Sequence, residues 1–116
     1  SCPAPQAVER LREMAGDLPT LGPAADRIAA RLAALSARGV DVDALPFAGS
    51  FGRTTLEYYD GFVFGFLAED HDAWPVVASG GRYDALTRVL DSSGGGVPAV
   101  GGIVRPEALL ALEAGR

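Results

Sequence analysis

Two short stretches of the chain place tyrosines beside charged residues. In the first, residues 56–64, Tyr58 and Tyr59 lie in a segment rich in aromatic and β-branched residues. Successive side chains of a strand point to opposite faces, so one ring would pack in a core and the other would face a pocket. A tyrosine hydroxyl donates and accepts hydrogen bonds, and an imidazole offers one donor and one acceptor. The pair suits recognition of an imidazole, although packing of both rings is the simpler interpretation when the pair is taken alone.

The second stretch, residues 79–86, combines two glycines with an arginine, a tyrosine and an acid. We expect Gly80 and Gly81 to form a tight turn that brings the backbone close to a ligand. Arg82 could bind a carboxylate or phosphate with its planar guanidinium. Tyr83 could line the same pocket, and Asp84 suits the start of a helix. An ordinary strand–helix corner with a surface arginine would use the same residues.

The elements that must position these residues follow from the hydrophobic period. Apolar residues at helical spacing predict one helix beginning near Pro5 and a second from Gly22 to Gly39, where glycine suits a left-handed cap. After residue 45 the period changes to two and predicts a sheet. The expected strands span 47–53, 58–67, 74–78 and 97–104, and the expected helices span 83–90 and a segment from Pro106. The prediction is an α+β fold, an antiparallel β-sheet flanked by helices.

Composition limits the classes of protein that fit. The 116 residues suit a single domain, here a helical segment over 1–45 followed by a sheet with helices over 46–116. A net charge of −5 argues against a nucleic-acid partner. Cys2 is the only cysteine, which excludes an internal disulfide and favours a reducing compartment. We expect no membrane partner, no cofactor and no metal site, since His71 lies in an acidic turn without further ligands. The absence of an initiator methionine indicates a piece of a larger gene product.

Taken together and in this order, the two stretches resemble the histidine-recognition motifs of the histidyl-tRNA synthetase family, whose catalytic core has the class II aminoacyl-tRNA synthetase fold. The first motif is matched by Leu56, Tyr58, Tyr59, Gly61, Val63 and Phe64. The second is matched by Gly80, Gly81, Arg82, Tyr83, Asp84 and Leu86. Residues 97–102, followed by Glu107 and Leu109, are similar to the motif 3 region. The resemblance covers residues 51–113 and implies the C-terminal part of such a core. It implies a histidine pocket formed by Tyr58, Tyr59, Arg82 and Tyr83, supported by a turn of Gly80, Gly81 and Asp84.

The chain departs from this family where ATP is handled. Thr54 occupies the position of the catalytic arginine, and Arg53 is one residue away. A shift of one residue on a strand moves a side chain to the other face. The arginine of motif 3 would fall at Ala108. Neither threonine nor alanine can replace a bidentate guanidinium, so we do not expect the chain to form an aminoacyl adenylate.

Recognition motifs without ATP-binding arginines are similar to the regulatory-subunit family of ATP phosphoribosyltransferase, a synthetase-like paralogue in histidine biosynthesis. The resemblance implies a non-catalytic, cytoplasmic protein that partners a short-form catalytic subunit in a homo- or hetero-oligomer. It also implies histidine as an allosteric effector. Two alternatives remain: a protein-interaction module without a ligand, and a fragment of a divergent histidyl-tRNA synthetase in which Arg53 reaches the adenylate.

Overall fold

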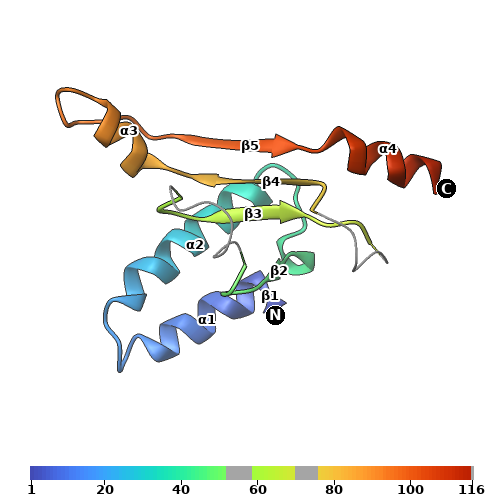
Figure 1. The fold of residues 1–116 in the computed structure, drawn as a ribbon. Coiled ribbons are helices and arrows are strands. Elements are labelled where there is room, and N and C mark those ends of the chain that lie inside the picture. The colour runs from blue at the N-terminus through green and yellow to red at the C-terminus, as the bar shows by residue number, and fades with distance from the viewer. Residues whose placement is uncertain (52–58, 70–75, 116) are drawn as a thin grey trace. The chain divides into compact units, whose positions relative to one another are not determined.

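The computed structural model describes residues 1–51, 59–69 and 76–115. The chain forms two compact units, Ser1–Gly49 and Ser50–Arg116, and each unit has a sheet of its own (Figure 1). No helix in the described ranges is long and apolar enough to cross a membrane. The predicted mixture of helices and antiparallel sheet is confirmed.

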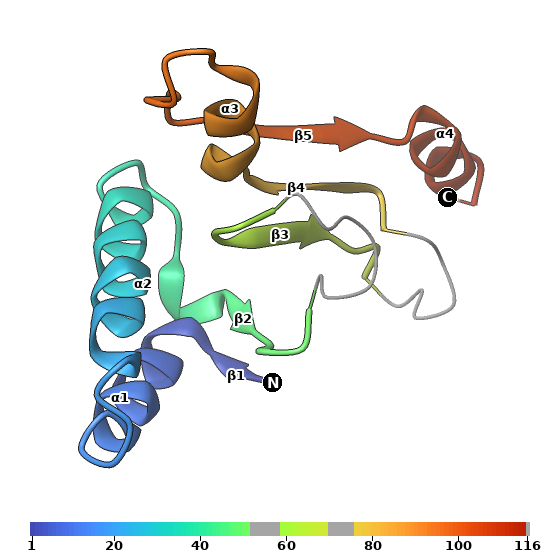
Figure 2. The same cartoon turned by 60° about the vertical axis from the view of Figure 1, so that its left-hand side comes forward.

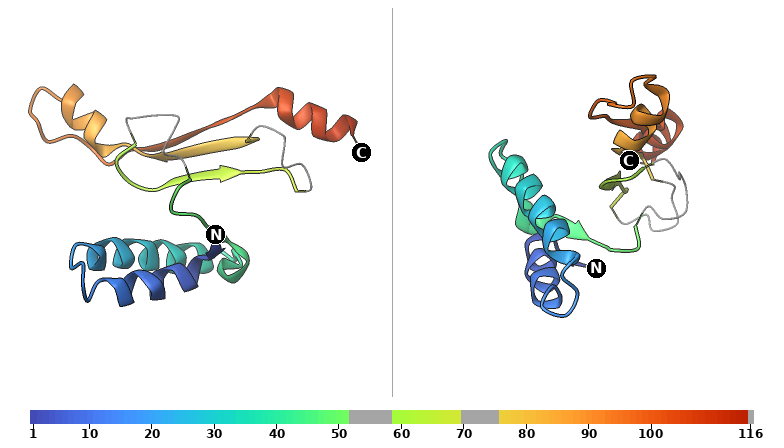
Figure 3. Two further views of the ribbon diagram at one scale, coloured as in Figure 1. Left: turned by 60° about the horizontal axis from the view of Figure 1, so that its bottom comes forward. Right: turned by 90° about the vertical axis from the view of Figure 1, so that its left-hand side faces the viewer.

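The first unit is a helical hairpin closed by a short sheet. Helices α1 (Ala4–Met14) and α2 (Leu21–Ser36) pack side by side (Figures 2 and 3). Strand β1 (Cys2–Pro3) pairs antiparallel with β2 (Pro46–Phe47), and the 3₁₀ helix η1 (Val42–Ala44) precedes β2. The N–H of Ala4 donates to the Leu45 carbonyl at 2.8 Å, which ties the start of α1 to this strand pair.

Small residues bring the two helices together. The buried residues of the hairpin are Ala4, Ala7, Val8 and Ala25. Pro5 lies in the first turn of α1, where its missing N–H costs no helical hydrogen bond. The chain reverses after α2 at Gly39, whose φ of 85° favours glycine. Both helices and the left-handed glycine agree with the sequence expectations.

The described residues of the second unit form a three-stranded antiparallel sheet with a helix after each of the last two strands. Its strands are β3 (Val63–Phe66), β4 (Ala78–Arg82) and β5 (Val100–Val104), in the order β3-β4-β5. Helix α3 (Asp84–Leu90) follows β4, and α4 (Pro106–Ala114) follows β5 (Figure 1). The β3–β4 pairing extends beyond the strand, because the N–H of Asp60 donates to the Arg82 carbonyl at 3.1 Å.

Glycines line both faces of the central strand. Phe64, Gly80 and Gly102 are register neighbours, and the Phe64 ring lies where a Cβ on Gly80 would be, 2.6 Å from its Cζ. On the other face, Gly81 pairs with Gly101. A turn was predicted at Gly80 and Gly81, but both are buried inside β4. The two glycines make room for the rings of Phe64 and Tyr59 on opposite faces of β4. The predicted turn is therefore wrong, because glycine is typical both of turns and of strands that another group approaches closely.

Candidate functional site

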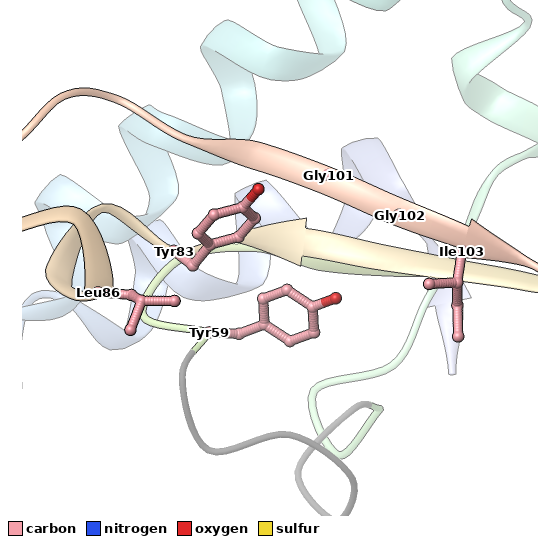
Figure 4. A pocket seen from close by; sticks show the side chains of 6 residues that line it. All are labelled: Tyr59, Tyr83, Leu86, Gly101, Gly102 and Ile103. Carbon is pink, nitrogen blue, oxygen red and sulfur yellow. The ribbon is translucent and has the colours of Figure 1, made fainter. Parts of the chain in front are cut away.

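Two tyrosines from separate elements line one pocket beside β5. Tyr59 precedes β3 and Tyr83 immediately precedes α3, and their ring centroids are 6.3 Å apart at an interplanar angle of 47°. The pocket has a volume of about 450 Å³ and is lined by Tyr59, Tyr83, Leu86, Gly101, Gly102 and Ile103 (Figure 4). This volume falls within the roughly 300–1,000 Å³ of small-molecule sites.

The glycine pair Gly81–Gly101 gives both rings their places over the sheet. A Cβ on Gly81 would lie 2.8 Å from Cδ1 of Tyr59, and a Cβ on Gly101 would lie 3.0 Å from Oη of Tyr83. The tyrosine rings therefore occupy the space that two cross-strand side chains would otherwise fill. The backbone of Gly101 and Gly102 forms a glycine floor for the pocket, and the Tyr83 ring lies against it at Gly101.

Hydrogen bonds with Ala99, the residue before β5, fix the backbone around Tyr83. The N–H of Tyr83 donates to the Ala99 carbonyl at 2.9 Å. In return the N–H of Ala99 donates to Oδ1 of Asp84 at 2.8 Å, while Nε of Arg82 donates to Oδ2 at 2.8 Å. These hydrogen bonds, led by that from Ala99, hold the pKa of Asp84 below its ordinary value of 3.8. Asp84 is thus a carboxylate at neutral pH that locks the Tyr83 corner.

Asp60 links the Tyr59 segment to α3, and sequence reasoning missed it. One of its oxygens, Oδ2, accepts the Ala85 N–H at 2.9 Å and lies 3.4 Å from the Arg88 guanidinium. The available signal was an acid directly after the tyrosine pair and before a glycine. That signal was not decisive, since the same pattern is typical of an exposed turn.

A second carboxylate organises the loop after α3. Asp91 accepts the N–H groups of Ser93 at 2.9 Å and Gly96 at 2.8 Å, and the Ser93 hydroxyl lies 2.8 Å from each oxygen. The Ser93 N–H is the largest cause of the lowered pKa of Asp91. Gly94 and Gly96 have φ of 75° and 64°, so the loop depends on left-handed glycines.

The structure brings together part of the predicted site. Tyr59 and Tyr83 share the pocket, whereas Arg82 is absent from its lining residues and contacts Asp84 instead. Asp84 accepts hydrogen bonds from Arg82 and Ala99 beside Tyr83, and Gly81 lies within β4 under the Tyr59 ring. Tyr58 lies outside the described residues, as do Arg53 and Thr54.

The metal prediction has a similar limit. Within the described ranges, no group of three or more His, Cys, Asp and Glu residues could hold a metal ion. His71 lies outside these ranges.

Comparison with known proteins identifies the relatives of the chain. It is 44% identical over 81 residues to the ATP phosphoribosyltransferase regulatory subunit of Rhizobium johnstonii, which is 70% of this chain and 21% of that protein. It is 43% identical to the protein of the same name in Rhizobium etli, with the same shares covered. It is 38% identical over 100 residues to that of Agrobacterium fabrum, covering 85% of this chain and 26% of the relative. No solved structure matches the chain significantly.

The chain thus spans about a fifth to a quarter of the length of these relatives. A family model described as histidyl-tRNA synthetase matches residues 3–109, nearly the whole chain. The α+β arrangement of helices and antiparallel sheet fits the class II synthetase-like fold of that family. The expected resemblance to the ATP phosphoribosyltransferase regulatory subunits is confirmed by three relatives that carry this name. The chain belongs to the histidyl-tRNA synthetase family.

Proposed function

We propose that this chain is part of a non-catalytic regulatory subunit of ATP phosphoribosyltransferase in histidine biosynthesis, and that the Tyr59–Tyr83 pocket binds histidine. The proposal that the ligand is histidine rests on one observation: two tyrosines from separate motifs line a single pocket over a glycine floor. A pure interaction module would need no such pocket. The names of the relatives support the regulatory role.

The chemistry of the pocket suits an imidazole. Two phenolic hydroxyls can satisfy the donor and the acceptor of a neutral imidazole. The backbone at Gly101 and Gly102 offers a flat surface, and Leu86 and Ile103 add apolar contacts (Figure 4). Aromatic walls with a few placed polar groups are typical of small-molecule sites. Arg82 and Tyr58 remain predicted members of the pocket.

The motif 3 region supports a protein without adenylate chemistry. Ala108 occupies the position of the ATP-binding arginine, and this side chain is buried in α4 and has no donor. The nearby Arg105 donates from Nη1 to the Val76 carbonyl at 2.9 Å. Its guanidinium thereby contributes to the junction of β5 and α4. A nucleotide site that lacks arginine at positions 54 and 108 loses several kcal/mol of transition-state stabilisation, on the order of 3 kcal/mol per removed donor.

A regulatory role needs partners, and the surface of the second unit favours association. Large apolar side chains are exposed there, with Phe66, Val100 and Val104 at least 60% exposed. We propose that the full-length protein assembles with a short-form catalytic subunit in the cytoplasm, in a homo- or hetero-oligomer. These three side chains share one face of the sheet, and apolar side chains gathered on one face mark interaction surfaces. Histidine would regulate the complex by binding one assembly state more tightly than another.

The test uses the full-length protein that contains this chain. Histidine binding is measured by calorimetry for the wild type, for Tyr83→Phe and for the control Gly95→Ala, whose added Cβ would make only ordinary 3.6 Å contacts in the loop after α3. Removing one hydroxyl should weaken binding by about 2- to 12-fold, the equivalent of 0.5–1.5 kcal/mol. The control should bind as the wild type does. Equal affinity for Tyr83→Phe would remove Tyr83 from the site.

A second assay separates regulation from aminoacylation. The full-length protein should give no histidine-dependent exchange of pyrophosphate into ATP. It should activate a short-form catalytic subunit added to it, and histidine should reduce that activity. Clear exchange would instead establish a divergent synthetase. Activation of the catalytic subunit without any binding of histidine would favour the interaction module.

A further inference from the structure

Asp60 is bonded to the chain on both sides of Tyr83. Its backbone N–H donates to the carbonyl of Arg82, the residue before Tyr83, at 3.1 Å. Its carboxylate accepts the N–H of Ala85, two residues after Tyr83, at 2.9 Å. Asp60 is also covalently joined to Tyr59. One residue therefore connects the two elements that carry the facing rings.

The hydrogen bond from the Ala85 N–H to the Asp60 carboxylate is expected to be stronger than the ion pair between Asp60 and Arg88. Ala85 lies in the first turn of α3, where N–H groups lack helical partners and favour a negative charge. A carboxylate that accepts such an N–H forms a charge-assisted hydrogen bond. The pair with Arg88 spans 3.4 Å between side chains that are 33% and 53% exposed, and exposed pairs of this kind contribute little. The Ala85 bond is therefore the contact that holds Asp60 to α3.

The consequence concerns the spacing of the rings. Tyr83 is held from the β5 side by Ala99 and from the β3 side by Asp60. Without the Asp60 carboxylate, the Tyr59 segment would keep its backbone bond to Arg82 but lose its hold on the helix that follows Tyr83. The distance between the rings, now 6.3 Å, would then be less constrained.

We propose that Asp60 is a positioning residue that fixes Tyr59 against Tyr83, and through this contact sets the shape of the pocket wall and its preference for a bare five-membered ring. This inference rests on the proposed binding of histidine. Asp60 need not touch the ligand. Its loss should loosen the selectivity of the pocket as well as weaken binding, because a pocket wall that can shift admits a larger ring.

The experiment measures affinities of the full-length protein for histidine and for histidine methylated on the ring. We compare the wild type with Asp60→Ala, which removes the acceptor, Asp60→Ser, which is too short to reach, and Asp60→Asn, which keeps an acceptor oxygen. Asp91→Asn is the matched control, because Asp91 organises a loop outside the pocket. Circular dichroism and thermal unfolding identify which variants fold.

Asp60→Ala and Asp60→Ser should lose up to about 10-fold in histidine affinity, because misplacing Tyr59 costs at most one of the hydrogen bonds that the tyrosines make to the ligand. Their preference for histidine over the methylated ligand should fall by a similar factor. Asp60→Asn should recover most of both quantities, and Asp91→Asn should match the wild type. A role in stability alone would lower the melting temperature without changing the preference.

The outcomes separate the two proposals. If the wild type binds histidine and Asp60→Ser equals Asp60→Asn in affinity and preference, the positioning role is wrong and the pocket stands. This comparison holds even if Asp60→Ala does not fold. If the wild type binds no histidine, the proposed function is wrong, and the positioning role is overturned with it.

Discussion

Replacing Gly101 with alanine should weaken histidine binding while leaving the sheet intact. The added Cβ would lie 3.0 Å from Oη and 3.4 Å from Cε1 of Tyr83, at the far end of that side chain. Such a contact is relieved when the ring gives way by a few tenths of an ångström. The backbone of Gly101 needs no left-handed conformation, since its φ is not positive. The added Cβ should therefore mainly displace the Tyr83 hydroxyl.

The expected magnitude follows from that hydroxyl. A neutral hydrogen bond contributes about 0.5–1.5 kcal/mol, so its displacement should raise the dissociation constant by about 2- to 12-fold. The unfolding free energy should change by less than about 1 kcal/mol, because glycine-to-alanine changes at compatible positions are mild. In contrast, a Cβ on Gly81 would meet the Phe62 carbonyl at 2.8 Å. Gly81→Ala should therefore also cost stability, on the order of 1–3 kcal/mol.

Calorimetry of the full-length protein measures the first effect, and denaturant unfolding measures the second. Gly95→Ala is the matched control, because its added Cβ would meet only Asp91 and Ser93 atoms at 3.6 Å, an ordinary contact distance. The control should change neither quantity beyond error. If Gly101→Ala binds histidine as tightly as the wild type does, the Tyr83 hydroxyl is not a ligand contact and the reasoning from the glycine floor is refuted.

Further predictions concern stability. Asp84 and Asp91 have lowered pKa values in the folded state, so their contribution is present above the ordinary value of 3.8 and is lost as the pH falls through the folded pKa. Melting temperatures should drop below about pH 4, and Asp84→Asn combined with Asp91→Asn should flatten that drop; an unchanged slope would contradict the hydrogen-bond network. In the first unit, Gly22→Ala should change stability by less than about 0.5 kcal/mol, because the gain in helix propensity is offset by the restriction that Pro23 places on the residue before it. Gly39→Ala should destabilise by about 1–2 kcal/mol because φ is 85°. Denaturant unfolding that ranks these two variants in the opposite order would contradict the helix assignment.

Local sequence signals were sufficient for the helices. Apolar spacing predicted α1 and α2, and the prolines at positions 5 and 106 indicated the first turns of α1 and α4. Strand β1 had no such signal. Its two residues form a strand only because Pro46 and Phe47 pair with them from the far end of the unit. That contact depends on tertiary structure, which a local pattern does not carry.

The sequence pattern predicted two tyrosines of the candidate pocket but not the residues that hold them in place. Tyr59 and Tyr83 were expected in one pocket, and both line it. The role of Gly81 was misread, because a glycine pair is typical of turns and equally of strands that aromatic rings approach closely. Asp60 was missed because its partner, the Ala85 N–H, lies 25 positions away in the sequence. Contacts at that separation follow from strand pairing and not from residue type.

The most direct test of the histidine pocket is a crystal structure of the full-length protein with histidine. We expect the imidazole in the pocket lined by Tyr59, Tyr83 and Gly101, against one face of the tyrosine pair, with a ring nitrogen within about 3 Å of a tyrosine hydroxyl. Histidine bound elsewhere, with this pocket empty, would contradict the account.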